Sequence, residues 1–366
     1  MSKSGLKADA ARGASVKRTA AFVAAAAFVF ALAACASRPE GNLIPVSVTT
    51  PGTTAVEMLI ATTRAEDPRP GVMFNGERAH GLRFADIGVS IPPDANRKIG
   101  DVQWPSSVPG DPARDFVTLR ADMLDLPQLK STFDDRLKNG PTSHVLIFVH
   151  GYNTRFEEAV YRFAQIVHDS KAPVLPFLFT WPSRGDLLNY VYDHDSATYS
   201  RDALEDVLQA MVDDPRVGAI SVLAHSMGNF VAVEALRQLA IRDKGLPPKI
   251  KDIMLASPDI DFEVFRREIA EIEKSGKTAP VTLFVSNDDQ ALSASSFLAG
   301  GEPRLGALDP RVEPFKSNLE RAGVNVVDLS TFKSDDPMNH SKFADAEVVT
   351  SIGERLAEGQ TLTDAH

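Results

Sequence analysis

The chain has 366 residues, of which 43% are hydrophobic, and a formal net charge of −10 at pH 7. This length and composition suffice for one large buried core, whereas so acidic a chain is poorly suited to binding nucleic acid or anionic lipid surfaces. Its single cysteine, Cys35, excludes intramolecular disulfides and argues against a cysteine-based catalytic or metal site.

The first 34 residues have the pattern of an export signal. Basic residues precede an uninterrupted apolar run over 20–34, which is too short for a comfortable membrane span. The run ends in Leu32-Ala-Ala-Cys35, which resembles a bacterial lipobox, where the cysteine is acylated and becomes the new N-terminus. We therefore predict a lipoprotein signal peptide over 1–34, and over 35–54 an acylated Cys35 followed by a tether. The alternative is an ordinary signal peptide with a chance cysteine.

Short apolar strands follow, and most of them alternate with segments of helical period. The strands are predicted at 56–62, 84–91, 145–149, 174–180, 220–224, 253–256, 281–286 and 324–329. The helices are predicted at 156–169, 200–212, 227–240, 262–274 and 343–356. Fully apolar strands that alternate with helices predict an α/β fold, with a mostly parallel sheet of about eight strands and helices on both faces. The first two strands precede the alternation and are expected to form an antiparallel edge.

One domain is expected over 55–356, followed by a C-terminal tail over 357–366. Two segments interrupt its alternation of strands and helices. Residues 182–200 follow a strand and mix aromatic with acidic residues, so they could cap a substrate or pack into a satellite core. Residues 297–316 are rich in glycine and proline and are expected to be an irregular insertion at the rim of the pocket.

The segment Ala224-His-Ser-Met-Gly228 lies between an apolar strand and a helix-period run. A serine flanked by small residues at such a junction is typical of a nucleophile elbow, in which the serine occupies a sharp strand-to-helix turn. The elbow makes Ser226 a candidate nucleophile and aims the amide of Met227 at the substrate carbonyl. The alternative is that Ser226 is only the N-cap of the helix.

A serine nucleophile needs a base and an acid, which follow it in the order acid, histidine in α/β-hydrolases. Only two histidines follow Ser226 far enough along the chain for an acid to lie between the serine and the histidine. One of them is the last residue, and chain ends are usually poorly ordered, so His340 is the expected base. The acid should follow a strand, and either Asp289 or Asp288 satisfies this condition, with Asp289 preferred. Two other aspartates, Asp259 and Asp261, are better explained as caps of the helix that begins at residue 262.

The second oxyanion donor is expected after the strand at 145–149. There, His150-Gly151 allows the backbone to turn over the site, which makes the amide of Tyr152 the candidate. We expect His150 to hold this loop by hydrogen bonds, with no direct chemical role. Thr154 and Glu157 predict a capping box at the start of the next helix. The sequence contains no metal-ligand spacing, phosphate-binding loop or dinucleotide fingerprint, so no cofactor and no metal are expected.

Several short motifs together resemble the uncharacterised bacterial esterase/lipase-like α/β-hydrolases, a domain of unknown function, over about residues 55–355. The motifs are Ala61-Thr-Thr-Arg64, His150-Gly-Tyr-Asn153, Trp181-Pro-Ser183, Tyr199-Ser200, Ala224-His-Ser-Met-Gly228, Ser257-Pro-Asp-Ile-Asp261, Asp289-Gln-Ala-Leu292 and Asn339-His-Ser341. The resemblance implies an α/β-hydrolase fold with Ser226 as nucleophile, Asp289 as acid and His340 as base.

The expected function is that of a serine hydrolase that cleaves small-molecule carboxylic esters through an acyl-enzyme. It would be held in the cell envelope by lipidated Cys35, on the periplasmic side of the outer membrane, since Ala36 is not a retention signal of the Asp type. No nucleic acid or protein partner is expected. The alternatives are an amidase, peptidase or acyltransferase that uses the same triad, or a non-catalytic envelope scaffold on a hydrolase fold.

Overall fold

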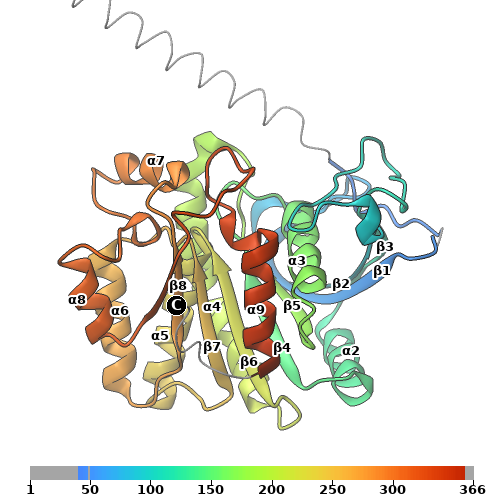
Figure 1. Ribbon diagram of the computed structural model, residues 1–366. Coiled ribbons are helices and arrows are strands. Elements are labelled where there is room, and N and C mark those ends of the chain that lie inside the picture. Colours follow the sequence, from blue (N-terminus) through green and yellow to red (C-terminus); the bar gives the residue numbers. More distant parts are fainter. Residues whose placement is uncertain (1–39, 48–49, 359–366) are drawn as a thin grey trace, which may run out of the picture. The chain divides into compact units, whose positions relative to one another are not determined.

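A mixed nine-stranded sheet forms the centre of the fold, in the order β3-β2-β1-β5-β4-β6-β7-β8-β9 (Figure 1). The computed structural model describes residues 40–47 and 50–358, so the expected signal peptide and Cys35 lie outside the described residues. The strands are β1 (Thr54–Asp67), β2 (Met73–Ile91), β3 (Val117–Leu124), β4 (His144–Val149), β5 (Leu175–Thr180), β6 (Ala219–His225), β7 (Ile250–Ala256), β8 (Val281–Val285) and β9 (Asn325–Asp328).

Strands β1, β5, β4, β6, β7, β8 and β9 run parallel to one another, in this spatial order. The β1–β2 and β2–β3 pairs at the edge of the sheet are antiparallel. All eight predicted strands are present, and the first two form the expected antiparallel pair. The ninth, β3, is not predicted because only its first two residues are buried, and its exposed half carries charged side chains such as Asp122. This architecture is the α/β-hydrolase fold.

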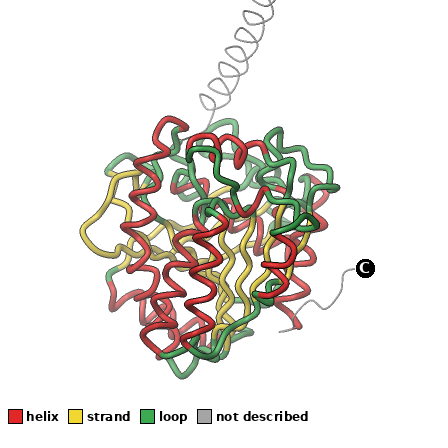
Figure 2. The backbone as a smooth tube through the Cα atoms, turned by 90° about the vertical axis from the view of Figure 1, so that its left-hand side faces the viewer, coloured by secondary structure: helices red, strands yellow, loops and turns green. Residues whose placement is uncertain are grey.

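Helices cover both faces of the sheet (Figure 2). Alternate strand residues explain this, because Val145 and Ile147 of β4 point into one core and Leu146 and Phe148 into the other. Helices α3 and α9 pack on one face, and α2, α4, α5 and α6 on the other. The helices are α2 (Leu126–Asn139), α3 (Phe156–Ser170), α4 (Tyr190–Asp213), α5 (Gly228–Asp243), α6 (Phe262–Ser275), α7 (Gln290–Leu298), α8 (Phe315–Arg321) and α9 (Ala346–Glu358).

The strand order reverses around β4. The chain passes from β4 through α3 to β5 on one side, and then through α4 to β6 on the other. In parallel α/β sheets, ligands bind outside the carboxyl ends of the strands at such a reversal. The loops after β4, β6, β7 and β8 therefore meet where a functional site is expected.

Three segment boundaries differ from those expected. Helix α4 begins at Tyr190, so the interruption at 182–200 consists of a loop, a 3₁₀ turn (Leu187–Asn189) and the first turns of α4. Residues 42 and 43, inside the segment expected to be a tether, are buried, and the Leu43 amide donates to the Gly71 carbonyl (3.0 Å). Helix α9 continues to residue 358, beyond the expected start of the tail.

The irregular segment at 297–316 contains the end of α7, a 3₁₀ turn (Leu305–Ala307) and the start of α8. Gly306 in this segment packs against the loop after β7, where a Cβ would lie 2.5 Å from the Ser257 carbonyl carbon. None of the helices described between residues 40 and 358 has both the length and the apolarity needed to cross a membrane.

Candidate active site

Ser226 occupies a sharp turn between β6 and α5. Its φ is +54°, a left-handed conformation that is uncommon outside glycine and is typical of strained functional positions. The turn is held from behind, since the Ser226 carbonyl accepts hydrogen bonds from Asn229 Nδ2 (2.8 Å) and the Asp259 amide (3.2 Å). The Ser226 amide donates to the Ala256 carbonyl at the end of β7 (3.0 Å). This geometry is that of a strand-to-helix elbow.

Two glycines allow neighbouring backbones to approach Ser226. A Cβ on Gly228 would lie 2.2 Å from the His150 carbonyl oxygen, so α5 can pack against the end of β4 only with glycine there. A Cβ on Gly151 would lie 2.7 Å from the Ser226 Cβ. The loop after β4 therefore passes directly over the serine. Met227 is the N-cap of α5, at the end of the helix where the first amides lack an intrahelical acceptor.

His340 is joined to Asp289 by a short hydrogen bond. His340 Nδ1 lies 2.7 Å from Asp289 Oδ2, and the Asp289 carboxylate is fully buried. Burial lowers the pKa of His340, but the hydrogen bond and charge of Asp289 outweigh burial, so this pKa is raised above its ordinary value. Asp289 also caps α7 by accepting from the Leu292 amide (2.9 Å). One carboxylate thus both contacts His340 and caps α7.

Asp288 has a different partner. Its two carboxylate oxygens bind Lys342 Nζ at 2.8 and 2.9 Å, and Lys342 is fully buried. Burial raises the pKa of Asp288, but the hydrogen bond and charge of Lys342 outweigh it and lower that pKa overall. The structure therefore brings Asp289, and not Asp288, to the histidine.

The loop that carries His340 is fixed through its backbone. The amides of His340 and Ser341 both donate to Asp336 Oδ2 (2.8 Å each). The His340 carbonyl lies 3.1 Å from His225 Nε2, and the two imidazole rings are 4.7 Å apart. Burial and the charge of His340 hold the pKa of His225 well below its ordinary value, so His225 is neutral and donates from Nε2.

His225 directly precedes Ser226, so this contact places His340 beside the elbow. Within the described residues, no hydrogen bond joins Ser226 Oγ to His340 itself. Such bonds are often long before a substrate binds. The assignment of Ser226, Asp289 and His340 as a catalytic triad therefore stays a prediction.

His150 supports the loop over Ser226 in the manner expected. Its Nδ1 lies 2.8 Å from the Gly151 carbonyl, and its Nε2 accepts from the Trp181 amide (3.1 Å). The Trp181 indole donates to the His150 carbonyl (2.8 Å), and the two rings stack at 5.0 Å. Burial, followed by the charge of Arg64, holds the pKa of His150 well below its ordinary value, so the ring is neutral.

The capping box at the start of α3 lies one residue later than predicted. The Glu158 carboxylate accepts from the Arg155 amide (2.8 Å), whereas the Thr154 hydroxyl turns back to the Tyr152 carbonyl (3.1 Å). The Tyr152 hydroxyl donates to the Leu187 carbonyl (2.5 Å) and so joins this loop to the segment before α4. The proposed oxyanion role of the Tyr152 amide stays a prediction.

Arg64 on β1 is a functional candidate to which sequence reasoning assigned no role. It is buried, and its guanidinium donates to the carbonyls of Thr154 (2.7 Å), Ser183 (2.8 Å) and Asn75 (3.2 Å). Its Nη2 also lies 3.2 Å from His150 Nε2. Burial lowers its pKa to about 10. Arg64 therefore ties the loop after β4 to the loop after β5. Only its place in a family motif signalled its importance.

In the described part of the chain, neither Asp259 nor Asp261 forms a hydrogen bond with the imidazole of His340. Asp261 caps α6 by accepting from the Glu263 and Val264 amides, as expected. Asp259 instead accepts from the hydroxyls of Ser295 (2.6 Å) and Tyr190 (3.2 Å) and pairs with Arg304 (3.2 Å), which joins α4, α7 and the irregular segment.

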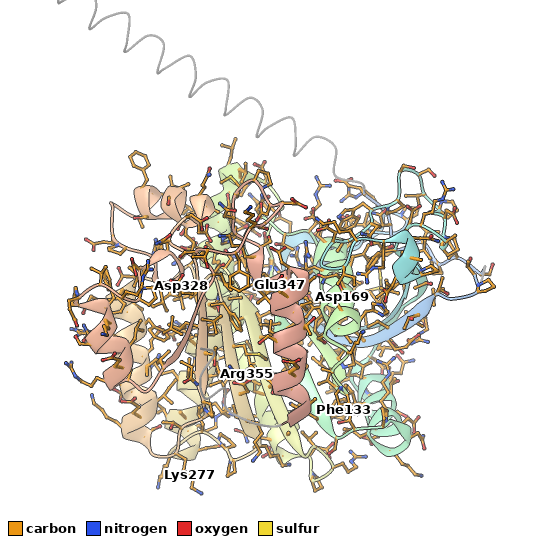
Figure 3. All side chains as sticks on the ribbon, in the orientation of Figure 1. Phe133, Asp169, Lys277, Asp328, Glu347 and Arg355 are labelled. Carbon is orange, nitrogen blue, oxygen red and sulfur yellow. The ribbon has the colours of Figure 1, made fainter. Side chains whose placement is uncertain are left out.

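Cavities also occur away from the candidate site. An apolar one of about 920 Å³ between α2 and α4 includes Phe133, and another of about 560 Å³ includes Lys277 and Arg355. Figure 3 labels these three residues in the middle and lower parts of the molecule. Within residues 40–47 and 50–358, no cluster of three or more His, Cys, Asp or Glu side chains could hold a metal ion.

Comparison with known proteins identifies a family. Residues 127–357 match the family described as alpha/beta hydrolase of unknown function (DUF900). An uncharacterised protein of Nostoc sp. is 24% identical over a match that covers 45% of this chain and 57% of the relative. The match thus spans little more than half the length of that curated relative.

Solved structures of proteins described as esterases or lipases are also similar. A lipase-esterase related protein from Clostridium acetobutylicum is 13% identical, with a TM-score of 0.32, over 60% of this chain and 96% of that chain. An esterase from the archaeon Pyrobaculum calidifontis is 11% identical, with a TM-score of 0.35, over 76% of this chain and 82% of that chain. Because these scores are low, the family match and the strand order carry the assignment of the fold.

Proposed function

The chain belongs to the family described as alpha/beta hydrolase of unknown function (DUF900), and we propose that it is a serine hydrolase that cleaves carboxylic esters. The observation that carries the proposal is the conformation of Ser226, which is held at φ +54° on the elbow next to the His340–Asp289 pair. A strained serine beside an imidazole whose Nδ1 is fixed by a buried carboxylate is the arrangement that activates a hydroxyl.

In the proposed reaction, His340 Nε2 takes the proton of Ser226 Oγ as the oxygen attacks the ester carbonyl. The C–O bond to the alcohol breaks, and the alcohol leaves with the proton from His340. Water, deprotonated by the same imidazole, then hydrolyses the acyl-enzyme. Asp289 keeps the proton of the neutral ring on Nδ1 and stabilises the imidazolium. The raised pKa of His340 favours that imidazolium.

The oxyanion of each tetrahedral intermediate would be stabilised by the amides of Met227 and Tyr152. Support comes from the position of Met227 at the start of α5, and from Gly151, which brings the loop after β4 against Ser226. The network of Arg64, His150 and Trp181 would keep this loop in place before the substrate binds.

The proposal includes attachment to the envelope through acylated Cys35, on the sequence pattern described above. Substitution Cys35→Ala should move the protein from the detergent phase to the aqueous phase in a phase-partition assay. A variant that stays in the detergent phase would contradict lipidation at Cys35.

The ester preference is tested by comparing 4-nitrophenyl acyl esters with the matched anilides. Wild-type protein should hydrolyse the esters, and Ser226→Ala should not. Hydrolysis of the anilides at comparable rates would favour an amidase or peptidase, and transfer of the acyl group to an added alcohol would favour an acyltransferase. A folded wild type that hydrolyses neither substrate would favour a non-catalytic scaffold.

A further inference from the structure

Four apolar side chains beside the candidate site are unusually exposed to solvent. Among the residues described, the four most exposed large apolar side chains are Leu188 (74%), Val191 (74%), Phe297 (83%) and Leu298 (63%). We call these four residues the apolar rim. They lie on two segments, the start of α4 with its preceding turn and the end of α7, and both segments lie at the top of the molecule in Figure 1.

The two halves of the apolar rim are joined to each other and to the serine turn. The Tyr190 hydroxyl, between Leu188 and Val191 in the chain, lies 2.9 Å from Ser295 Oγ on α7. Both hydroxyls donate to Asp259, whose amide in turn donates to the Ser226 carbonyl (3.2 Å). A surface that binds the apolar rim would therefore be held next to Ser226.

The charged side chains beside the apolar rim are carboxylates, or arginines that are paired with carboxylates. Helix α7 has no charged side chain. In the turn before α4, the Asp186 carboxylate accepts a hydrogen bond from the Leu188 amide (2.8 Å). The nearby Arg184 forms an ion pair with Glu77. Exposed apolar side chains whose neighbouring cations, Arg184 and Arg304, are already paired fit a surface of zwitterionic or uncharged lipids better than an anionic one.

The first buried residues of the described chain, such as Leu43, lie at the same edge of the sheet. Leu43 pairs with Gly71 in the hairpin that follows β1, and β1 runs parallel to β5, so this hairpin lies beyond the carboxyl ends of the parallel strands. The six residues 36–41 span about 20 Å even when fully extended. A lipid on Cys35 would thus hold this edge close to a bilayer.

We infer that the apolar rim seats on a lipid bilayer and that the substrates are acyl esters presented by that bilayer. This inference rests on the proposed function, in which Ser226 takes the acyl group as the ester C–O bond breaks. The remaining alcohol leaves with a proton from His340, and water releases the acyl group as a fatty acid. Insertion of the apolar rim would keep the ester bond of a membrane lipid within reach of Ser226.

The seating is tested without catalysis, in the full-length protein reconstituted into phosphatidylcholine vesicles. Tryptophan fluorescence of Phe297→Trp should be quenched by lipids brominated in their acyl chains, beyond the quenching of wild type, which has two tryptophans. Val264→Trp is the matched control, at an exposed apolar position on α6, and should show no added quenching. Equal quenching of the two variants would overturn the inference.

The substrate class is tested with Leu188→Ser/Phe297→Ser, against Ile241→Ser/Val264→Ser as an exposed apolar control pair. Hydrolysis of an acyl ester embedded in the vesicles should fall about tenfold in the rim variant alone, whereas hydrolysis of a water-soluble acetate ester should be retained. An equal loss on both substrates would overturn the inference. If the wild type hydrolyses neither ester, the proposed function is refuted, and with it the substrate class. The quenching experiment would still show whether the apolar rim inserts into the bilayer.

Discussion

Asp289 and Asp288 are adjacent in the chain, but replacing each with asparagine should affect a different property, the catalytic rate for Asp289 and the thermal stability for Asp288. Asp289→Asn removes the charge that faces His340 Nδ1 at 2.7 Å, but an asparagine Oδ1 can still accept from the Leu292 amide and cap α7. We therefore expect a large loss of rate with little change in thermal stability. Asp288→Asn should lower stability, because the buried Lys342 loses its charged partner.

The size of each effect follows from its surroundings. At an effective dielectric constant of about 20, a charge pair at this separation is worth about 4–6 kcal/mol. If the imidazolium of His340 forms in the transition state, loss of that attraction corresponds to about a 10³–10⁴-fold fall in kcat/KM. Asp288 is 41% exposed, so solvent screens its pair with Lys342, and its loss should cost about 1–2 kcal/mol, or a few degrees in Tm.

The assay measures kcat/KM with a soluble chromogenic ester and Tm by differential scanning fluorimetry on both variants. Full activity of Asp289→Asn, together with a collapse of activity in a folded Asp288→Asn, would refute the assignment of the acid. Equal losses in both variants would show that the two carboxylates act as one unit, which the separate hydrogen bonds in the structure contradict.

Three further outcomes are expected. Arg64→Lys should lower kcat/KM about 10–100-fold, because one ammonium cannot bind all the acceptors that the guanidinium now binds. The control Arg184→Lys, at the exposed ion pair with Glu77, should change kcat/KM less than threefold. Similar rates in both variants would refute the positioning role of Arg64. The acid limb of the kcat/KM profile should lie above pH 6.5, because the base must be neutral and the pKa of His340 is raised; a limb below pH 6 in a pH-rate profile would contradict this. Burial, followed by the neighbouring carboxylate Glu234, raises the pKa of Glu268. The folded state therefore binds more protons than the unfolded state, and stability falls as pH rises above the ordinary glutamate range. Glu268→Gln should therefore raise Tm at pH 8 more than at pH 5, and a difference in Tm that does not change with pH would contradict the buried neutral carboxyl.

The fold was largely predictable because its strands are short, apolar and bounded by helices of clear period. Periodicity failed where burial is partial. Strand β3 and helix α2 bury few side chains, in α2 only Leu129 and Phe133, so neither has a strong apolar pattern. The start of α4 mixes aromatic with acidic side chains, among them Tyr190 and Asp193, whose partners lie on other elements. This mixture has no clear helical period, and the sequence therefore predicts an interruption there.

The candidate site was predictable only in part, because local motifs do not encode tertiary contacts. The order of the serine, acid and histidine was visible in the chain, but two adjacent aspartates are equivalent until Lys342 is seen to occupy one of them. The role of Arg64 depends on carbonyls that are 11, 90 and 119 residues away in the chain. No pattern within β1 predicts these partners.

The most direct test of the proposed serine hydrolase is covalent labelling by a fluorophosphonate, with the modified residue identified by peptide mass spectrometry. The label should be found on Ser226 in the wild-type protein and should be absent from Ser226→Ala and His340→Ala variants that retain the wild-type circular dichroism spectrum. A folded wild type that takes no label, or a label found on another serine, would contradict the activation of Ser226 by His340 and Asp289.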